Sequence, residues 1–312
     1  MYPIIVAKQM IILFLIVLIG TFLRKKELVT DEHSKFMSSM VINVFNPALI
    51  FTSAVSQKCE DTTMVYKTFI FALLSYLLLI VTGKIYQKFF AKEHLERNIY
   101  QMLFVFSNVG FIGIPVINAM FGSYALVYVA IFIMEYNVLL YTYGMSLLST
   151  EPKRQTFYAK IKPLINIGMF SCIFAILFFT LNIPVPEIIK TPLTYLGNCA
   201  TPVSLLIIGF SIGSQEKISR LFTGIKYYMF CFLKLVVTSV IGILIFKHMP
   251  LVPELIRTLC VVLMAMPCGS MTLMIVQKAG IDDKDCCTGI LLSTILSVAT
   301  LPLVVLLYNI IP

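Results

Sequence analysis

The sequence predicts an all-α integral membrane protein with ten transmembrane helices in two inverted repeats of five. Of its 312 residues, 59% are hydrophobic and 12% are charged, and the mean hydropathy is +0.94. A soluble domain of this size needs many more charged residues to cover its surface. The apolar residues form runs of about 20, the length that crosses a bilayer. In addition, prolines recur at matched positions in the two halves of the chain.

Ten apolar segments follow one another, and most connections between them are short, as in a helical bundle. The first segment is expected to be a retained span and not a signal peptide, because its cations follow the apolar run and no A-x-A cleavage site is present. The expected spans are residues 4–23, 35–56, 64–88, 98–121, 124–148, 161–181, 189–213, 223–247, 253–279 and 286–310.

The lysines and arginines are distributed unequally between the two sides of these spans. Seventeen of the 24 lie in or beside odd-numbered connections, six lie on the other side, and Lys234 lies inside a span. The positive-inside rule therefore predicts that the odd connections are cytoplasmic and that both termini lie outside the plasma (inner) membrane. The net charge of +9 follows this topology and forms no continuous patch, so no nucleic-acid partner is expected.

The polar segment 149–160 is expected to be a cytoplasmic linker between a first repeat, 1–148, and a second repeat, 161–312. Because each set holds an odd number of spans, the two sets must have opposite orientations, which is the condition for an inverted repeat. The matched residues are Asn43 and Pro47 with Asn198 and Pro202, at an offset of 155, and Pro115 with Pro267, at an offset of 152.

The fourth and ninth spans are predicted to be broken near their middles. Proline removes a backbone donor, and nearby glycines lower the cost of leaving helical geometry. An unwound stretch in a membrane must line a cavity enclosed by protein, and the exposed N-termini of the half-helices favour an anion. The predicted substrate-binding residues are therefore Asn108, Gly110, Gly113 and Pro115 in the fourth span, and Pro267, Gly269 and Ser270 in the ninth.

Three further asparagines belong to the same predicted site. Asn43 and Asn46 precede or adjoin Pro47, and Asn198 lies four residues before Pro202. An asparagine near a proline can cap freed carbonyl groups or reach a substrate, and the sequence leaves both interpretations open.

Two ionisable residues lie deep inside predicted spans, Glu135 in the fifth and Lys234 in the eighth. Buried charges are costly unless they are paired or hydrated, so such residues are functional hypotheses by default. Glu135 is the candidate proton carrier, with Asn137 as a polar neighbour. Lys234 is expected to pair with Glu135 or to attract an anion. A purely structural Glu–Lys pair is the alternative.

No metal or cofactor is expected. Most of the eight cysteines lie within apolar spans, where they pack as small polarisable side chains, and Cys286–Cys287 lacks the spacing of a zinc site. The three histidines lie at span edges, and none has a potential ligand partner three or four residues on.

Four segments carry a resemblance to a known family. These are NPALIF in the second span, NVGFIGIP in the fourth, TPVSLLIIG in the seventh and STILSVATLPL in the tenth. Together they resemble the auxin efflux carrier family over nearly the whole chain. The short linker is similar to that of the bacterial branch, which includes malate and malonate permeases.

The resemblance implies a fold similar to that of the bile-acid:sodium symporters, with broken helices 4 and 9 crossing each other. Spans 1, 2, 6 and 7 would form a scaffold, and spans 3–5 and 8–10 would form a transport domain. Pro115 and Pro267 match the crossover positions, with Asn108 and Ser270 beside them. The resemblance further implies elevator-type alternating access and a homodimer.

The predicted function is secondary transport, or facilitated diffusion, of a small mono- or dicarboxylate, by uniport or coupled to protons. A sodium-coupled symporter of the same fold is the alternative, although no acidic residue accompanies the polar groups of the fourth and ninth spans. A membrane-embedded enzyme is disfavoured because no HExxH motif or histidine lies in mid-span. A receptor or a plain channel is disfavoured by the absence of a signalling domain and by the paired breaks.

Overall fold

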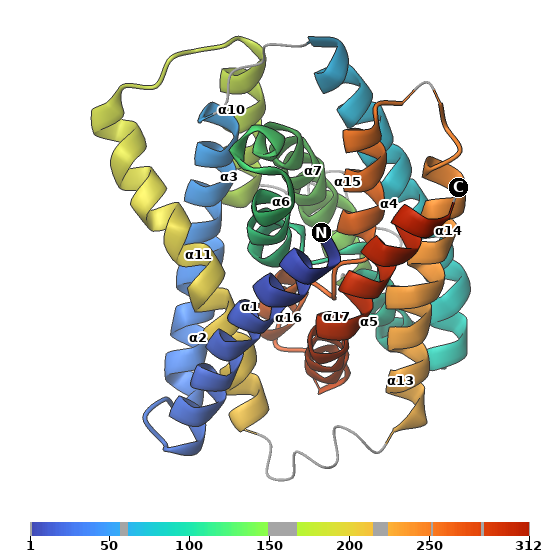
Figure 1. Ribbon diagram of the computed structural model, residues 1–312. Helices are drawn as coiled ribbons and strands as arrows, with labels where there is room; N and C mark the ends of the chain where they lie inside the picture. The colour runs from blue at the N-terminus through green and yellow to red at the C-terminus, as the bar shows by residue number, and fades with distance from the viewer. Residues whose placement is uncertain are drawn as a thin grey trace, which may run out of the picture.

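The computed structural model describes residues 2–56, 62–148, 167–214, 224–250, 252–281 and 284–311, and within them every regular element is a helix (Figure 1). Seven helical stretches are long and apolar enough to cross a membrane. They are Tyr2–Lys25, Asp31–Val55, Thr63–Phe90, Leu126–Leu148, Glu187–Gly213, Ile225–Phe246 and Lys284–Ile310. These stretches establish an all-helical, multi-pass membrane protein.

The other three predicted spans are represented by shorter helices. The fourth is divided into α5 (His94–Val105), η2 (Val109–Gly113) and α6 (Ile114–Phe121), and the ninth into α15 (Glu254–Met264) and α16 (Ser270–Lys278). The sixth is seen as α10 (Ile167–Thr180), whose expected start lies outside the described residues, as does the linker 149–160. The total of ten spans and the inverted repeat therefore remain predictions.

Three of the long spans contain a widened π-helical turn. The second span runs through α2 (Asp31–Met40), η1 (Val41–Phe45) and α3 (Asn46–Val55). The fifth comprises α7 (Leu126–Leu139), η4 (Leu140–Gly144) and α8 (Met145–Leu148), after the short η3 (Ser123–Ala125). The eighth comprises α13 (Ile225–Cys231), η6 (Phe232–Val237) and α14 (Thr238–Phe246). Such turns re-aim side chains and are frequent near functional sites.

The first helix, α1 (Tyr2–Lys25), packs closely along α11 (Glu187–Gly213). A Cβ atom on Gly209 would lie 2.2 Å from the carbonyl oxygen of Val17, so the backbones meet where only glycine fits. Small residues permit this approach in membranes, where dispersion contacts hold helices together. Helix α3 also packs against both α10 and α11, and the three lie together on one side of the molecule (Figure 1).

On the other side lie α4 (Thr62–Phe90), α5, α13, α14 and α17 (Lys284–Ile310) (Figure 1). An ionic cluster joins three of these helices. The Lys226 ammonium donates to Glu96 Oε1 at 2.7 Å and to Asp285 Oδ2 at 3.2 Å, and the Tyr227 hydroxyl donates to Asp285 Oδ1 at 2.5 Å. Charge-assisted bonds of this kind are stronger than neutral ones, so they help α5, α13 and α17 to behave as one unit.

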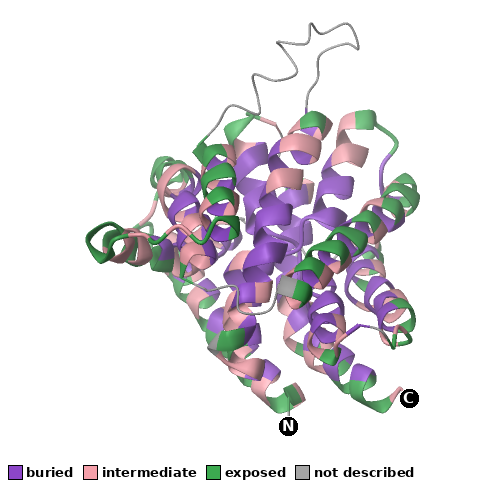
Figure 2. Ribbon diagram, turned by 90° about the horizontal axis from the view of Figure 1, so that it is seen from above, coloured by how far each residue is buried: buried purple, intermediate pink, exposed green. Residues whose placement is uncertain are grey.

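Burial is concentrated in the middle of the molecule, and the peripheral helices are largely exposed (Figure 2). Residues 99–109 and 258–276 are all buried, whereas α1 and α4 present rows of exposed leucine, isoleucine and phenylalanine. The broken spans are thus shielded from lipid by the surrounding helices. This shielding allows their backbone to leave helical geometry, because protein groups can satisfy the freed donors and acceptors.

Candidate substrate site at the crossing of two broken helices

The fourth span is interrupted between Val105 and Val109. Phe106 and Asn108 have backbone angles outside the helical region, with ψ of 80° and 59°. Asn108 then starts the next helical stretch, because its side-chain Oδ1 accepts a hydrogen bond from the Phe111 N–H at 3.2 Å. A side-chain cap of this type satisfies one of the free donors at a helix start.

The ninth span is interrupted between Met264 and Ser270. Pro267 lies within this break, and Gly269, with φ −75° and ψ 131°, is the N-cap of α16. Helix α16 then runs only to Lys278. The predicted unwinding of both spans is therefore present.

The two breaks are joined directly by their backbones. The Asn108 N–H donates to Pro267 O at 2.8 Å, and the Gly269 N–H donates to Phe106 O at 2.7 Å. Ser107 and Cys268 thus form an antiparallel bridge. A Cβ atom on Gly269 would lie 2.8 Å from Phe106 O and 2.9 Å from the Tyr136 hydroxyl oxygen. The crossing consequently requires glycine at position 269.

A small cavity adjoins this crossing. It leaves about 10 Å³ for the centre of a water molecule, which is room for about one water. An organic acid needs a much larger space, so the site must open to admit one. The lining residues come from α3, the two breaks and α7: Asn46, Ser107, Asn108, Val109, Gly110, Phe111, Ile133, Tyr136, Asn137, Gly269, Ser270 and Met271.

Two polar atoms beside the cavity lack a hydrogen-bond partner among the described residues. They are Asn108 Nδ2 and Ser270 Oγ, both buried. Most buried polar atoms in proteins are hydrogen-bonded, so these two atoms at one cavity are available to a water molecule or to a ligand. Asn46 and Asn137 are already engaged: Asn46 Nδ2 donates to Asn137 Oδ1 at 3.4 Å, and Asn137 Nδ2 donates to Ile133 O at 2.7 Å. The free amide and hydroxyl are suited to bind oxygen atoms of a ligand.

Helix ends add to the polarity of the site. The stretch Val109–Phe121 begins at Asn108, and α16 begins at Ser270, so two helix N-termini start at the cavity. The N–H groups at such ends and the positive end of the helix dipole favour negative charge. The site is therefore equipped for an anion more than for a cation.

Most of the predicted residues of the broken spans meet here. From the broken spans, Asn108, Gly110, Gly269 and Ser270 line the cavity, and the carbonyl oxygen of Pro267 is an acceptor in the bridge. Asn46 of α3 lines the cavity as well.

The position of Pro115 differs from the prediction. The crossing is made by residues 106–108, and Pro115 lies farther along, in the first turn of α6. Proline fits there because the first N–H groups of a helix need no intrahelical acceptor. Gly113 also lies beyond the cavity, facing Leu263, whose Cδ2 would be 3.0 Å from an added Cβ.

Asn43 and Asn198 lie away from the cavity. The Asn43 amide donates to Ser39 O at 2.9 Å and to Ser39 Oγ at 3.0 Å, and Asn43 lines an apolar groove of about 430 Å³ between α3, α10 and α11. Asn198 is exposed on α11, which stays helical through Pro202. Asn46, three residues later, lines the cavity instead. Residues three apart share a face of a regular α-helix, but Asn43 lies in the π-helical turn η1, which changes the rotation of the side chains.

Glu135 and Lys234 are both buried, but they do not form the predicted ion pair. Lys234 Nζ donates to Phe104 O and to Ser107 Oγ, each at 2.7 Å. Both Glu135 carboxyl oxygens lack a hydrogen-bond partner among the described residues, and the side chain lies near Tyr76 and Cys260. The neighbours of Glu135 in sequence, Ile133, Tyr136 and Asn137, line the cavity. The structural Glu–Lys pair is thus excluded.

The cavity is also lined by residues that were not predicted from the sequence: Ser107, Val109, Phe111, Ile133, Tyr136 and Met271. Ser107 directly precedes Asn108 in the segment that predicted the break, so its inclusion required only the knowledge of where the break begins. Tyr136 and Met271 carry no comparable signal. Tyr136 reaches the site because α7 packs against η2.

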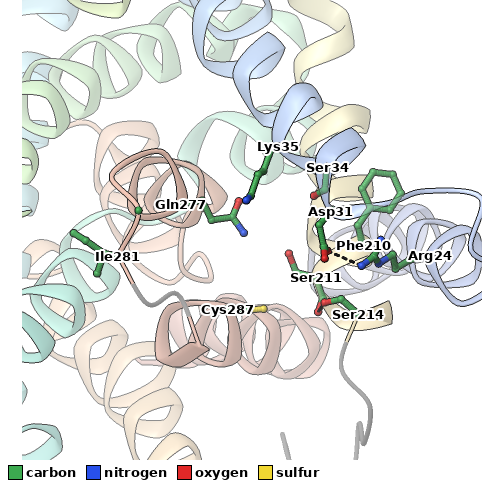
Figure 3. A pocket seen from close by; sticks show the side chains of 11 residues that line it. Arg24, Asp31, Ser34, Lys35, Phe210, Ser211, Ser214, Gln277, Ile281 and Cys287 are labelled. Atoms are coloured by element: carbon green, nitrogen blue, oxygen red, sulfur yellow. Dashed lines mark hydrogen bonds and ion pairs between the residues drawn. The ribbon is translucent and has the colours of Figure 1, made fainter.

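Another cavity, of about 420 Å³, lies among the ends of α1, α2, α11, α16 and α17 (Figure 3). Lys35 of α2 and Gln277 of α16 point toward each other across it, and Arg24 pairs with Asp31 at 2.5 Å on its wall. We call this cavity the vestibule. Its lining residues are Arg24, Asp31, Ser34, Lys35, Phe210, Ser211, Ser214, Gln277, Gly280, Ile281 and Cys287. Seven residues of α16, about 10 Å, separate Gln277 from Ser270 at the crossing.

The fold and the site define a multi-pass membrane protein of the transporter class. The sequence profile of the membrane transport protein family matches residues 5–305, and the chain belongs to this family, as the resemblance to auxin efflux carriers implied. It is 27% identical over 304 residues to an uncharacterized transporter of Methanocaldococcus jannaschii, with 94% of this chain and 96% of the relative covered. The family and this relative are both transporters.

Proposed function

We propose that the protein is a secondary transporter or facilitator of a small mono- or dicarboxylate, which binds at the crossing of the broken helices. The observation that carries this proposal is the pair of unpartnered polar groups, Asn108 Nδ2 and Ser270 Oγ, at two helix N-termini. An amide N–H₂ can only donate, and a hydroxyl donates readily. Carboxylate oxygens are the acceptors that such an arrangement fits.

The arrangement of the vestibule favours movement of one body against another. Arg24, Lys35 and Ser211 come from the proposed scaffold spans 1, 2 and 7, and Gln277 and Cys287 come from the proposed transport spans 9 and 10. Sliding of the transport spans would connect the vestibule to the crossing and enlarge the small cavity there. By the distribution of lysine and arginine, the vestibule faces the cytoplasm of the plasma (inner) membrane, and both termini lie outside. A homodimer through the scaffold is part of the same proposal.

Glu135 is the proposed proton carrier. Its buried carboxyl group has no hydrogen-bond partner among the described residues, and an ionised carboxylate without a partner is costly to bury. A group of this kind can exchange its proton when the conformation changes its surroundings. Its position on α7, between residues that line the cavity, links the proton to the site. If Glu135 does not couple a proton to substrate binding, the proposed transporter is a uniporter.

Uptake into liposomes tests the proposal. The purified protein is reconstituted, and uptake of labelled C3–C5 mono- and dicarboxylates is measured with and without an inward proton gradient, with an aromatic acid as comparison. We expect saturable uptake of one class of carboxylate, and stimulation by the gradient. Empty liposomes and protein carrying Asn108→Leu serve as controls. Absence of uptake for every carboxylate would contradict the substrate class.

A further inference from the structure

Among the described residues, Lys234 is the one lysine or arginine whose side chain is fully buried. It lies in the π-turn η6 in the middle of an apolar span. A buried ammonium needs compensation, because removal of an ion from water costs several kcal/mol. No carboxylate in the described part of the chain pairs with it. Its two acceptors are Phe104 O and Ser107 Oγ, each 2.7 Å from Nζ.

These acceptors mark the C-terminal end of a half-helix. Helix α5 ends at Val105, so Phe104 has one of the last carbonyl groups of that helix. Such carbonyls lack partners within the helix and carry the negative end of its dipole. In transporters with broken helices, half-helix C-termini and unwound carbonyls are the places where a coupling cation is coordinated. In this protein the ammonium of Lys234 lies at such a place.

We propose that Lys234 is a covalently attached cation that replaces a free coupling ion at the C-terminal end of α5. The inference rests on the proposed function. It adds that the C-terminal end of α5 binds no sodium ion. A tethered ammonium holds the crossing at any sodium concentration, and its charge remains when the substrate leaves. It therefore accounts for a stable break in the fourth span without an acidic residue and without a bound metal ion.

The positive charge of Lys234 also affects the cavity, through its hydrogen bond to Ser107. An ammonium can only donate hydrogen bonds, so Ser107 Oγ is the acceptor in its bond to Lys234. The Ser107 hydroxyl proton is consequently available for another acceptor, and Ser107 lines the cavity. A hydroxyl that accepts from a cation becomes a stronger donor, because hydrogen bonds in a chain polarise one another. Lys234 is thus a positioning residue: it orients the Ser107 hydroxyl, which can donate a hydrogen bond to an anion in the cavity.

Chemical rescue of a truncated lysine tests this inference without any organic anion. The full chain with Lys234→Ala is solubilised and purified in choline chloride, sodium chloride or propylammonium chloride, and its Tm is measured. Propylammonium matches the atoms that the substitution removes. We expect a lower Tm than wild type in choline, and recovery of at least half of the loss in propylammonium. Sodium is expected to give a smaller recovery, and tetramethylammonium, which has no N–H group, none.

The matched control is Leu235→Ala. Leu235 is adjacent in sequence and equally buried, at 1% exposure, and its truncation opens a cavity without removing a charge. Its Tm should fall and should respond to none of the cations, and the wild-type Tm should be the same in sodium and in choline. Equal recovery of the Leu235 and Lys234 variants, or no recovery of the Lys234 variant, would overturn the proposal.

A second variant covers the case in which Lys234→Ala does not fold. Lys234→Gln keeps a side-chain donor but loses the charge, so we expect a several-fold lower yield of monodisperse protein by size-exclusion chromatography in choline chloride. A wild-type yield and Tm for this variant would show that the charge is not needed, and would overturn the proposal. Because these measurements use no carboxylate, a failed uptake assay and a failed cation assay remain distinguishable.

Discussion

The hydroxyl group of Ser270 combines complete burial with the absence of a hydrogen-bond partner among the described residues. A serine of this kind contributes little to the folded state. At the first position of α16 it lines the cavity at the crossing, where we propose that it binds the substrate. Its two possible roles, in stability and in binding, can therefore be separated by one substitution.

We predict that Ser270→Ala leaves the Tm nearly unchanged and raises the KM for carboxylate uptake by about tenfold or more, since a hydrogen bond to a charged group contributes about 1.5–3 kcal/mol. Thermal unfolding and concentration-dependent uptake in liposomes measure the two effects. The matched control is Ser204→Ala, a second buried serine whose hydroxyl lacks a described partner but which does not line the cavity. Equal KM values for the two variants would contradict a binding role for Ser270.

For Glu135→Gln, we predict uptake that no longer responds to a proton gradient, with the yield of folded protein preserved. The amide is nearly the same size as the acid but cannot exchange a proton at accessible pH. Uptake with and without the gradient provides the measurement, and Glu254→Gln, which changes an exposed carboxylate at the start of α15, serves as control. A variant that keeps its gradient response would remove Glu135 from the coupling step.

At this scale the sequence located the polar residues but not their partners. Proline and glycine close together in an apolar span indicate a break in the helix, which is why Asn108, Gly269 and Ser270 could be predicted. Lys234 was expected either to pair with Glu135 or to attract an anion, and in the structure it donates to Phe104 O and Ser107 Oγ. Which face of a span a charged side chain occupies depends on helix rotation, and the π-turn around Lys234 changes that rotation.

Among the elements, the two broken spans depend on each other. Each break leaves an N–H and a carbonyl group that its own helix cannot satisfy, and the other break supplies the partners through the Asn108–Pro267 and Gly269–Phe106 bonds. Because the contact is between backbones, it depends on how closely the two chains can approach more than on side-chain chemistry. At position 269 the two backbones leave no room for a Cβ atom.

We predict that Gly269→Ala lowers stability by about 1–3 kcal/mol, the usual cost of overpacking, and abolishes uptake. The added Cβ would lie 2.8 Å from Phe106 O, so the bridge between the breaks must open. Gly242→Ala is the matched control, because its added Cβ would make ordinary contacts of 3.5 Å with Met264. A Gly269 variant with the Tm and uptake of wild type would show that the bridge is dispensable.

The elements also show where sequence patterns stop being informative. Proline predicted both breaks, but it lies inside only one of them: Pro267 is within the break, whereas Pro115 follows the crossing and Pro202 lies within the continuous helix α11. Proline disfavours the helix at the preceding turn, and neighbouring helices decide whether the chain unwinds there. Those neighbours are distant in sequence, so local patterns cannot reveal them.

Two of the cavities among the described residues differ greatly in size. The vestibule, at about 420 Å³, can hold a small organic acid, and the cavity at the crossing, at about 10 Å³, cannot. Transport therefore needs a motion that enlarges the second. The walls of the vestibule come from α1, α2 and α11 on one side and from α16 and α17 on the other, so this cavity must change shape as those groups move (Figure 3).

We predict that a covalent link across the vestibule stops transport. Lys35→Cys and Gln277→Cys, joined by a bis-maleimide, connect α2 to α16, which already contact each other. Cys199, which is exposed, and Cys287, which lines the vestibule, are first replaced by serine to limit competing reactions. Uptake should fall to the level of empty liposomes after cross-linking, with mass spectrometry confirming the link. Either cysteine alone, treated in the same way, should keep its activity. Full uptake by the linked protein would contradict relative motion of α2 and α16.

The bridge between the two breaks also sets an order of events during biosynthesis. Phe106 O and the Asn108 N–H enter the membrane about 160 residues before their partners at Gly269 and Pro267, and ribosomes add about 5–20 residues per second. The nascent fourth span must therefore wait for about 8–32 s with polar backbone groups that lipid cannot satisfy. During this interval it has to be shielded by water or by the insertion machinery, which makes the arrival of the ninth span the step that commits the chain to its final structure.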